Sequence, residues 1–194
     1  STGSWKTRAS CRVFFELLRI PVTGHRLASS VLGMDKLLSK QLFSKLGIAQ
    51  APSCELGSPG STTAEAAIER IRASEVEYPV MVKSAYGGSS GALELAESES
   101  SLMDIWNRWS GRRDVRGWRT FAECYIDGPE YSLGIFGHWQ SGDHVVLPLV
   151  GIEFEGKYFD KDIKFADRYR VNCSHELSSE LQSAMRDAAI AVHY

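Results

Sequence analysis

The stretch YPVMVKSAYGGSSG, residues 78–91, decides how the rest of the chain is interpreted. An apolar run ends at Lys83 and is followed by a loop of small residues rich in glycine and serine. Beyond the loop, Leu93 and Leu95 alternate with charged or small residues, which is the pattern of a second strand. The stretch therefore predicts a β-hairpin with a glycine-rich tip.

This loop matches neither of two common phosphate-binding motifs. A P-loop needs G-x-x-x-x-G-K-[ST], whereas here Lys83 precedes the glycines. A dinucleotide fingerprint needs a helix after its glycines, and here a strand follows. Two interpretations of the stretch remain open. The hairpin could fold over a polyphosphate, with backbone N–H groups, the Ser89 and Ser90 hydroxyls and the Lys83 ammonium as donors. The other interpretation is a mobile tip beside a solvated lysine, because glycine-rich turns are common.

Composition excludes several classes of protein. The 194 residues are 43% hydrophobic and 24% charged, as in ordinary globular domains, and the net charge of −2 gives no basis for binding nucleic acid or an anionic membrane. The four cysteines lie far apart without a C-x-x-C pair, and the histidines form no ligand cluster. No apolar run approaches the roughly 20 residues of a membrane span. We therefore expect a soluble, cytoplasmic protein.

The hydrophobic pattern predicts an α+β fold with mostly antiparallel strands. Helices are expected at residues 12–20, 25–47, 61–74, 98–111 and 176–194, and extended segments or strands at 21–24, 79–82, 92–98, 119–126, 130–139 and 144–154. Thr62 and Glu65 offer a capping box for the third helix, and Gly47 is a suitable C-cap for the second. The fourth helix should bury Leu102, Ile105, Trp106 and Trp109.

Four segments, in order from about Pro21 to the C-terminus, resemble the ATP-grasp ligases and, within them, the D-alanine–D-alanine ligases. They are PVTGHRLASSVLGMDKLLSKQLFSKLGIAQAP at 21–52, YPVMVKSAYGGSSG at 78–91, FAECYIDGPEYSLGIFG at 121–137 and GKYFDKDIKF at 156–165. The third fits the family's hinge motif E-x-[FWY]-[IL]-x-G-x-E-[FY]. The resemblance implies an ATP-grasp fold built from mostly antiparallel sheets with packed helices. It divides the chain into a remnant of an N-terminal domain with linking helices (1–50), a small subdomain with the glycine-rich loop (51–128) and the start of a larger, truncated subdomain (129–194).

The resemblance implies roles for residues that hold the base and the first phosphates of ATP. Lys36 and Lys83 would neutralise the α- and β-phosphates. Glu123 and the backbone of Tyr125 and Ile126 would form the hinge that reads the adenine edge. Taken alone, each charged residue is equally compatible with an ordinary solvent-exposed position.

Further roles concern the ribose, the closing loop and the transferred phosphate. Glu130 would accept hydrogen bonds from the ribose hydroxyls. Gly88, Ser89 and Ser90 would close over the phosphates, with Ser89 also holding the first amino acid. Lys164 would approach the γ-phosphate during its transfer.

The implied reaction is an ATP-dependent ligation that supplies a peptidoglycan precursor. The carboxylate of one D-alanine is phosphorylated to an acyl phosphate, and the amine of a second D-alanine displaces phosphate. The glycine-rich loop would close to exclude water from the acyl phosphate. Family members are commonly dimers, so a homodimer is an expected assembly.

Three departures from the family pattern qualify this interpretation. The chain stops before the family's oxyanion arginine and its ligands for Mg²⁺, and Asp160, Asp162 and Asp167 are expected in a loop outside that motif. Most of the N-terminal domain is missing, so we expect an incomplete chain or a degenerate relative that does not turn over alone. Phe165 replaces a usual tyrosine, which raises D-lactate as an alternative acceptor. A non-catalytic ATP-binding or scaffold protein is the alternative function.

Overall fold

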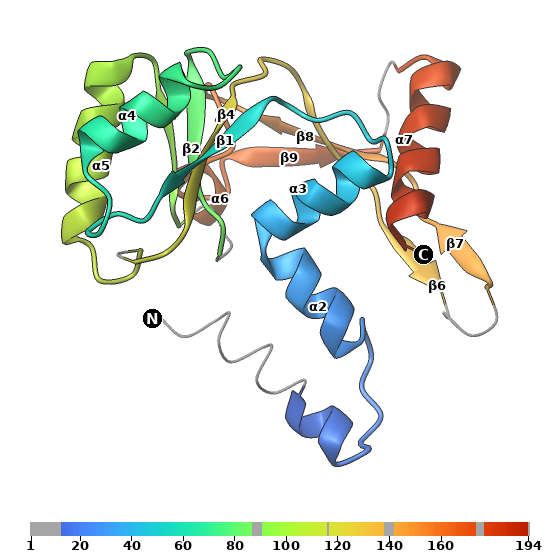
Figure 1. The fold of residues 1–194 in the computed structure, drawn as a ribbon. Coiled ribbons are helices and arrows are strands. Elements are labelled where there is room, and N and C mark those ends of the chain that lie inside the picture. The colour runs from blue at the N-terminus through green and yellow to red at the C-terminus, as the bar shows by residue number, and fades with distance from the viewer. Residues whose placement is uncertain (1–12, 87–90, 116, 138–141, 174–176, 194) are drawn as a thin grey trace. The chain divides into compact units, whose positions relative to one another are not determined.

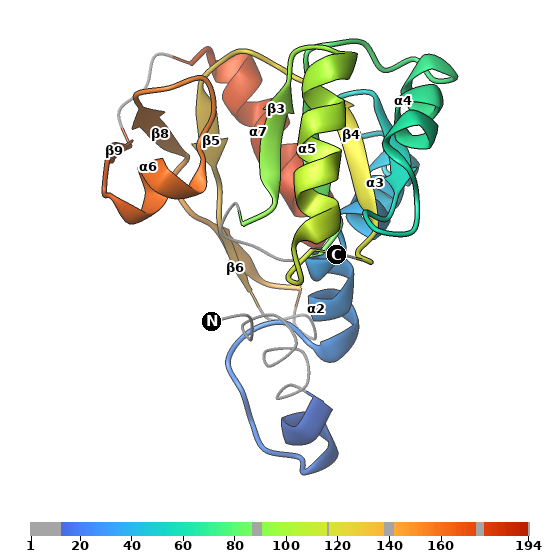
Figure 2. The same ribbon diagram turned by 90° about the vertical axis from the view of Figure 1, so that its left-hand side faces the viewer.

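The protein is described by a computed structural model that covers residues 13–86, 91–115, 117–137, 142–173 and 177–193 (Figures 1 and 2). The chain forms two compact units. The first unit comprises Ser1–Leu42 and Gln50–Ile126, and the second comprises Phe43–Ala49 and Asp127–Tyr194. Within the described residues, every helix falls short of the length and hydropathy needed to cross a bilayer.

The first unit is built on a four-stranded antiparallel sheet in the order β1-β4-β2-β3. Its strands are β1 (Ser53–Gly57), β2 (Val80–Ser84), β3 (Leu93–Ala96) and β4 (Thr120–Cys124). The pairing of β2 with β3 confirms the hairpin predicted around the glycine-rich loop. Helices α4 (Ala64–Arg72) and α5 (Glu99–Gly111) pack on one face of this sheet (Figures 1 and 2).

The core of the first unit lies between this sheet and its two helices. The four predicted core positions of α5 are all buried, and Trp106 and Trp109 are 1% and 0% exposed. The indole N–H of Trp106 donates to the Thr62 carbonyl at 2.8 Å, so this buried donor is satisfied. Burying a large aromatic side chain contributes on the order of 2–3 kcal/mol, which makes this layer the main source of the unit's stability.

The helix predicted at residues 25–47 is two helices, α2 (Leu27–Met34) and α3 (Lys36–Lys45). Asp35 separates them in an extended conformation, and its Oδ1 accepts hydrogen bonds from the N–H groups of Leu37 and Leu38 at 3.0 and 3.2 Å. This is the geometry of an N-cap, so Asp35 starts a new helix where the hydrophobic periodicity predicted continuation.

Gly47 ends α3 as predicted. It has a φ of 69°, and the N–H of Ile48 donates to the Phe43 carbonyl at 2.9 Å while the N–H of Gly47 donates to Ser44 at 3.1 Å. Those two bonds form a Schellman motif, for which glycine is the favoured residue.

Two local expectations in the first unit are wrong. Thr63, not Thr62, caps α4, because its side chain accepts the N–H of Ala66, while the Thr62 hydroxyl accepts the N–H of Ser58. Residues 21–24 form a bend and no strand. The short strand β1 was not predicted, because its five residues SCELG contain only two apolar positions, Cys54 and Leu56, which are too few to establish an alternation.

The second unit contains two small antiparallel sheets. One has the order β5-β8-β9 and the other pairs β6 with β7. The strands are β5 (Glu130–Ser132), β6 (Ile135–Gly137), β7 (His144–Val146), β8 (Val150–Phe154) and β9 (Tyr169–Asn172). The helices are α6 (Lys161–Phe165) and α7 (Ser179–His193), and the β6–β7 pair lies near the C-terminal end of α7 (Figure 1).

The prediction of two long strands at residues 130–139 and 144–154 is therefore wrong in detail. Each strand is interrupted, and the pair divides between the two sheets. The break lies where Leu147 approaches Gly134, whose carbonyl accepts the Leu147 N–H at 2.8 Å. The next residue, Pro148, has no N–H to donate to a ladder. Helix α6 and strand β9 were not predicted, because both are too short to show a period.

Candidate functional site

One face of the four-stranded sheet carries the charged residues singled out by the sequence. Met81 lies opposite Glu123 and Lys83 lies opposite Phe121 in the β2–β4 ladder, so these four side chains share a face. The alternate residues of the same strands belong to the core beneath α4 and α5. Strand alternation therefore places Lys83 and Glu123 on the face turned away from the core.

Glu123 receives two ammonium groups, one on each carboxylate oxygen. Lys83 pairs with Oε1, and Lys40 donates to Oε2 at 3.1 Å. The side chains of Lys40 and Glu123 are only 17% and 16% exposed, and that of Lys83 is 26% exposed. These are partly buried ion pairs, which solvent screens less than surface pairs.

The environment of Glu123 favours its ionised form. Burial raises the pKa of its carboxyl group, but the charges and hydrogen bonds of Lys83 and Lys40 outweigh that effect, and the pKa lies below its usual value of 4.5. Glu123 is therefore a fixed negative charge at neutral pH.

Lys36 brings a third ammonium group to this face from the first turn of α3. Its backbone N–H donates to the Ala85 carbonyl at 2.9 Å, and its Nζ donates to the Ser84 carbonyl at 3.2 Å. Burial lowers the pKa of Lys36, and the nearby charge of Lys83 lowers it further. Two lysines that repel each other in a partly buried position are suited to bind an anion, because an anion would relieve the repulsion.

Asp35 and Arg119 hold the start of α3 against the sheet. Asp35 is 4% exposed and lies 3.7 Å from Nη1 of Arg119, measured from Oδ2. Arg119 also makes a bidentate pair with Glu55 of β1, with both N–O distances at 2.9 Å. The backbone N–H of Ala85 donates to the Arg119 carbonyl at 2.8 Å. This network fixes where α3 begins and, with it, where Lys36 lies.

The predicted hinge follows Glu123 directly. The N–H of Tyr125 donates to the Pro79 carbonyl at 2.9 Å, so the Tyr125 carbonyl is the group through which this residue could meet a base edge. Ile126 is 70% exposed. Reading of adenine by this backbone stays a prediction.

The glycine-rich loop is anchored at both ends. The N–H of Ser84 donates to the Ala92 carbonyl at 3.1 Å, and the guanidinium of Arg112 donates to the Gly91 carbonyl at 2.8 Å. Gly88, Ser89 and Ser90 lie outside the described residues, so their predicted roles stay predictions.

The remaining residues predicted for the site belong to the second unit. Glu130 begins β5 and is exposed, and Lys164 lies in α6 and is half-buried. Phe165 ends α6 and is 66% exposed.

The aspartates near Lys164 are not all in a loop, contrary to expectation. Asp160 is the N-cap of α6, where its side chain accepts the N–H of Ile163 at 2.8 Å, and Asp162 lies in the first helical turn. Asp167 follows the helix with a φ of 51°. Among the residues that the structure describes, no three Asp, Glu, His or Cys side chains are grouped so that they could hold a metal ion.

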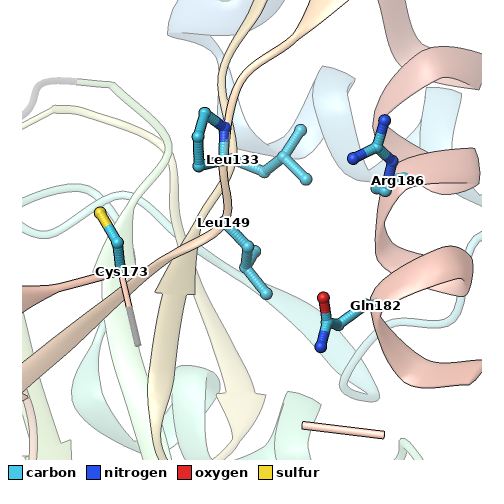
Figure 3. A pocket seen from close by; sticks show the side chains of 6 residues that line it. Leu133, Leu149, Cys173, Gln182 and Arg186 are labelled. Atoms are coloured by element: carbon cyan, nitrogen blue, oxygen red, sulfur yellow. The ribbon is translucent and has the colours of Figure 1, made fainter. Parts of the chain in front are cut away.

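The second unit also contains a cavity of about 170 Å³ (Figure 3). Leu133, Pro148 and Leu149 form its apolar side, and Cys173, Gln182 and Arg186 provide its polar side. Gln182 and Arg186 extend from α7 toward the two leucines (Figure 3). The cavity contains none of the residues predicted from the sequence.

Sequence reasoning missed three residues of the charged face, namely Lys40, Asp35 and Arg119. A signal existed for two of them. Lys40 follows Lys36 by four residues, which places both on one face of a helix. An aspartate directly before a helical run is a common N-cap. Arg119 had no such signal, because its partners are distant in sequence.

Comparison with known proteins agrees with this architecture. The family described as the D-ala D-ala ligase C-terminus matches residues 42–194. The D-alanine–D-alanine ligase of Methylococcus capsulatus is 36% identical over 157 residues, which cover 80% of this chain and 45% of that protein. The chain thus spans about half the length of the curated relatives it matches.

Solved structures show the same fold. The VanG D-Ala:D-Ser ligase of Enterococcus faecalis aligns with a TM-score of 0.74 at 22% identity, over 95% of this chain and 51% of that one. The D-alanine–D-alanine ligase of Bacillus anthracis, in a crystal structure complexed with ATP, aligns with a TM-score of 0.67 at 21% identity, over 94% of this chain and 53% of that one. The antiparallel α+β architecture expected for an ATP-grasp fold is confirmed. The chain belongs to the D-alanine–D-alanine ligase family.

Proposed function

We propose that this chain supplies the nucleotide-holding part of an ATP-dependent carboxylate–amine ligase that joins two D-alanines through an acyl phosphate. The product would serve peptidoglycan synthesis, and a reaction that consumes ATP would take place in the cytoplasm. Membership of the family supports the reaction class. The charged face of the first unit supports ATP as the energy source.

The observation that carries the proposal is the group of three lysines around one carboxylate. Lys36, Lys40 and Lys83 come together on the sheet face with Glu123. Three ammonium groups meet one carboxylate there. Burial lowers the pKa of Lys36, and the charge of Lys83 lowers it further, so an anion beside these two lysines would be favoured. A polyphosphate is a multivalent anion of the kind that such a group fits.

The residues of the first unit would act by positioning and neutralising charge, which is most of what phosphoryl transfer requires of a protein. Lys36 and Lys83 would neutralise the inner phosphates. Glu123 and the backbone of Tyr125 and Ile126 would face the base edge. The loop residues Gly88, Ser89 and Ser90 would cover the phosphates and exclude water, with Ser89 also holding the first amino acid.

The family resemblance assigns two further roles to residues of the second unit. Glu130 is proposed for the ribose hydroxyls and Lys164 for the transferred γ-phosphate. Mg²⁺ prefers six oxygen ligands. The described residues present no group of three such side chains, so we assign it no ligand here and derive no step from it.

Calorimetric titration with ATP tests the nucleotide site. The chain should bind ATP, and Lys83→Ala should weaken binding tenfold or more, about 1.4 kcal/mol. Lys45→Ala is a matched control, because Lys45 is an exposed residue of α3 beyond the group. Absence of ATP binding by the folded chain, or equal effects of the two variants, would contradict the proposed site.

The ligase class is tested by phosphate release in the presence of ATP, Mg²⁺ and D-alanine, with L-alanine as the matched control. Release that depends on D-alanine supports the proposed reaction. D-Lactate, supplied as a second acceptor, tests the alternative raised by Phe165. ATP binding without D-alanine-dependent release is expected if the chain supplies only the nucleotide-holding part, and it is also the behaviour of the alternative, a non-catalytic nucleotide-binding relative.

A further inference from the structure

Lys40 occupies a position that the phosphate-binding role does not explain. Its Nζ donates to Oε2 of Glu123 at 3.1 Å and to the Ala51 carbonyl at 3.2 Å. Its own carbonyl accepts the side-chain amide of Gln50 at 2.9 Å. With two acceptors fixing its ammonium, and with 17% of the side chain exposed, Lys40 is held beside Glu123.

Lys83 must satisfy two demands in the proposed function. In the structure, its ammonium pairs with Oε1 of Glu123. To neutralise a phosphate, it has to give up part of that pairing. A partly buried carboxylate that loses its only cation is costly, because it keeps its desolvation penalty without compensation.

We propose that Lys40 is a positioning residue that keeps Glu123 paired and ionised while Lys83 turns toward the phosphates of the nucleotide. The inference rests on the proposed function, because it requires a polyphosphate ligand on this face. Glu123 has a separate oxygen for each lysine, so Lys83 can move without disturbing the Lys40 pair. Lys40 therefore lowers the cost of ATP binding without touching the nucleotide.

Lys36 does not serve this purpose equally well. Its Nζ donates to the Ser84 carbonyl, and its place at the first turn of α3 directs it to the loop end of β2. Lys40 lies one helical turn further along α3 and reaches Glu123 at the hinge end of β4. Of these two lysines of α3, Lys36 is thus assigned as a phosphate ligand and Lys40 as the counter-ion of Glu123.

The first test is ATP affinity in Lys40→Met, which removes the charge and keeps the length of the side chain. Binding should weaken about tenfold, since Lys83 would then leave Glu123 without a cation. Lys45→Met, the same change on the same helix, should leave the affinity unchanged. Lys40→Arg retains a cation and should restore most of the affinity.

The second test compares the substitution in two backgrounds. In Glu123→Gln there is no carboxylate to keep paired, so adding Lys40→Met should change ATP affinity less than about twofold, whatever Glu123→Gln costs by itself. A tenfold loss in both backgrounds would mean that Lys40 acts on the nucleotide or on the fold, and it would overturn the inference. The doubly substituted chain removes the Lys40–Glu123 pair as a unit and leaves no carboxylate without a cation, so it offers a second measurement if Lys40→Met alone fails to fold.

A third readout separates positioning from a structural role. If Lys83 leaves Glu123 in the Lys40→Met chain, the carboxylate should take up a proton when ATP binds near pH 6. Calorimetry in buffers of different ionisation enthalpy measures this uptake, with wild type as the reference for protons exchanged by ATP itself. Extra uptake that disappears with Glu123→Gln supports the inference, and equal uptake in wild type and Lys40→Met contradicts it. No ATP binding by the folded wild-type chain would overturn both proposals, whereas binding that is insensitive to Lys40 would overturn only this one.

Discussion

The sheet of the first unit and the sheets of the second are all antiparallel, but they bury very different amounts of apolar side chain. Fifteen buried residues pack between β1–β4 and the helices α4 and α5. Among the described residues of the second unit, the buried hydrophobic residues are Leu149 and Ile163, and no residue of α7 is fully buried. Phe136 and Val145, a facing pair of the β6–β7 sheet, are 69% and 60% exposed.

This difference in burial also separates the site residues proposed in the first unit from those proposed in the second. Lys83 and Glu123 stand on strands whose opposite faces belong to a packed core, so their backbone positions are well determined. Glu130 and Lys164 stand on short elements with little burial around them. Within the described structure, the first unit therefore holds several charged side chains together in fixed positions. In the second unit, Glu130 and Lys164 lie on separate short elements.

The largest expected effect comes from removing the centre of the first unit's core. Trp106→Ala should lower the free energy of unfolding by about 3–5 kcal/mol, because it leaves a cavity and removes the donor to the Thr62 carbonyl. Phe136→Ala in the second unit should change it by less than about 0.5 kcal/mol. Urea unfolding followed by far-UV circular dichroism measures both. Similar losses of unfolding free energy in the two variants would contradict the difference in buried core between the units.

Amide hydrogen exchange sharpens the comparison without any substitution. Backbone amides of β2 and β4 should exchange slowest, because they lie in the middle of the four-stranded sheet over the buried core. Amides of β5, β8 and β9 should exchange faster by an order of magnitude or more. Equal protection of the two sets, measured by mass spectrometry of peptic fragments, would contradict the expected difference in local stability.

Acid should weaken the first unit partly through Glu123. Its pKa is lowered on folding, so its ion pairs stabilise the fold above the ordinary value of 4.5, and this contribution is lost as the pH falls through the lower folded-state pKa. Glu123→Gln should therefore be less stable than wild type at pH 7, with the gap closing as the pH approaches 3. Urea midpoints at successive pH values test this, and a gap that widens in acid would contradict the sign.

The smallest expected effect on stability is that of Lys36→Met. The pKa of Lys36 is lowered on folding, so its charge opposes folding at neutral pH, and losing that charge should leave the melting temperature unchanged or higher. The same variant should bind ATP more weakly. A clear loss of melting temperature together with unaltered ATP affinity would make Lys36 a structural residue.

The parts predicted well from the sequence are those in which one local pattern dominates. The β2–β3 hairpin follows from an apolar run, a glycine-rich loop and an alternating strand, and the buried face of α5 follows from helical spacing. The break at Asp35 was missed because apolar periodicity continues across it, although an aspartate before a helical run is itself a signal. The breaks near Gly134 and Pro148 depend on how two strands separate into different sheets, which a local pattern does not specify.

The candidate site shows the same limit. Lys36, Lys83 and Glu123 could be named because motifs carry them, and the structure brings these three together. The spacing of Lys40 from Lys36 places both on one face of a helix, but its contact with Glu123 joins residues 83 positions apart. Only tertiary packing brings Lys40 and Glu123 together, so this contact could not be predicted from the local sequence.

The most direct test of the central claim is the affinity for ATP relative to AMP, measured by calorimetry in wild type and in Lys83→Ala. The lysine group is proposed to recognise phosphates, so the wild-type chain should prefer ATP by about tenfold or more. Lys83→Ala should reduce that preference, because ATP carries the β-phosphate that AMP lacks, so the variant should weaken ATP binding more than AMP binding. If the ATP-to-AMP preference is the same in both chains, Lys83 does not act on the phosphates, and the assignment of this face as a polyphosphate site is wrong.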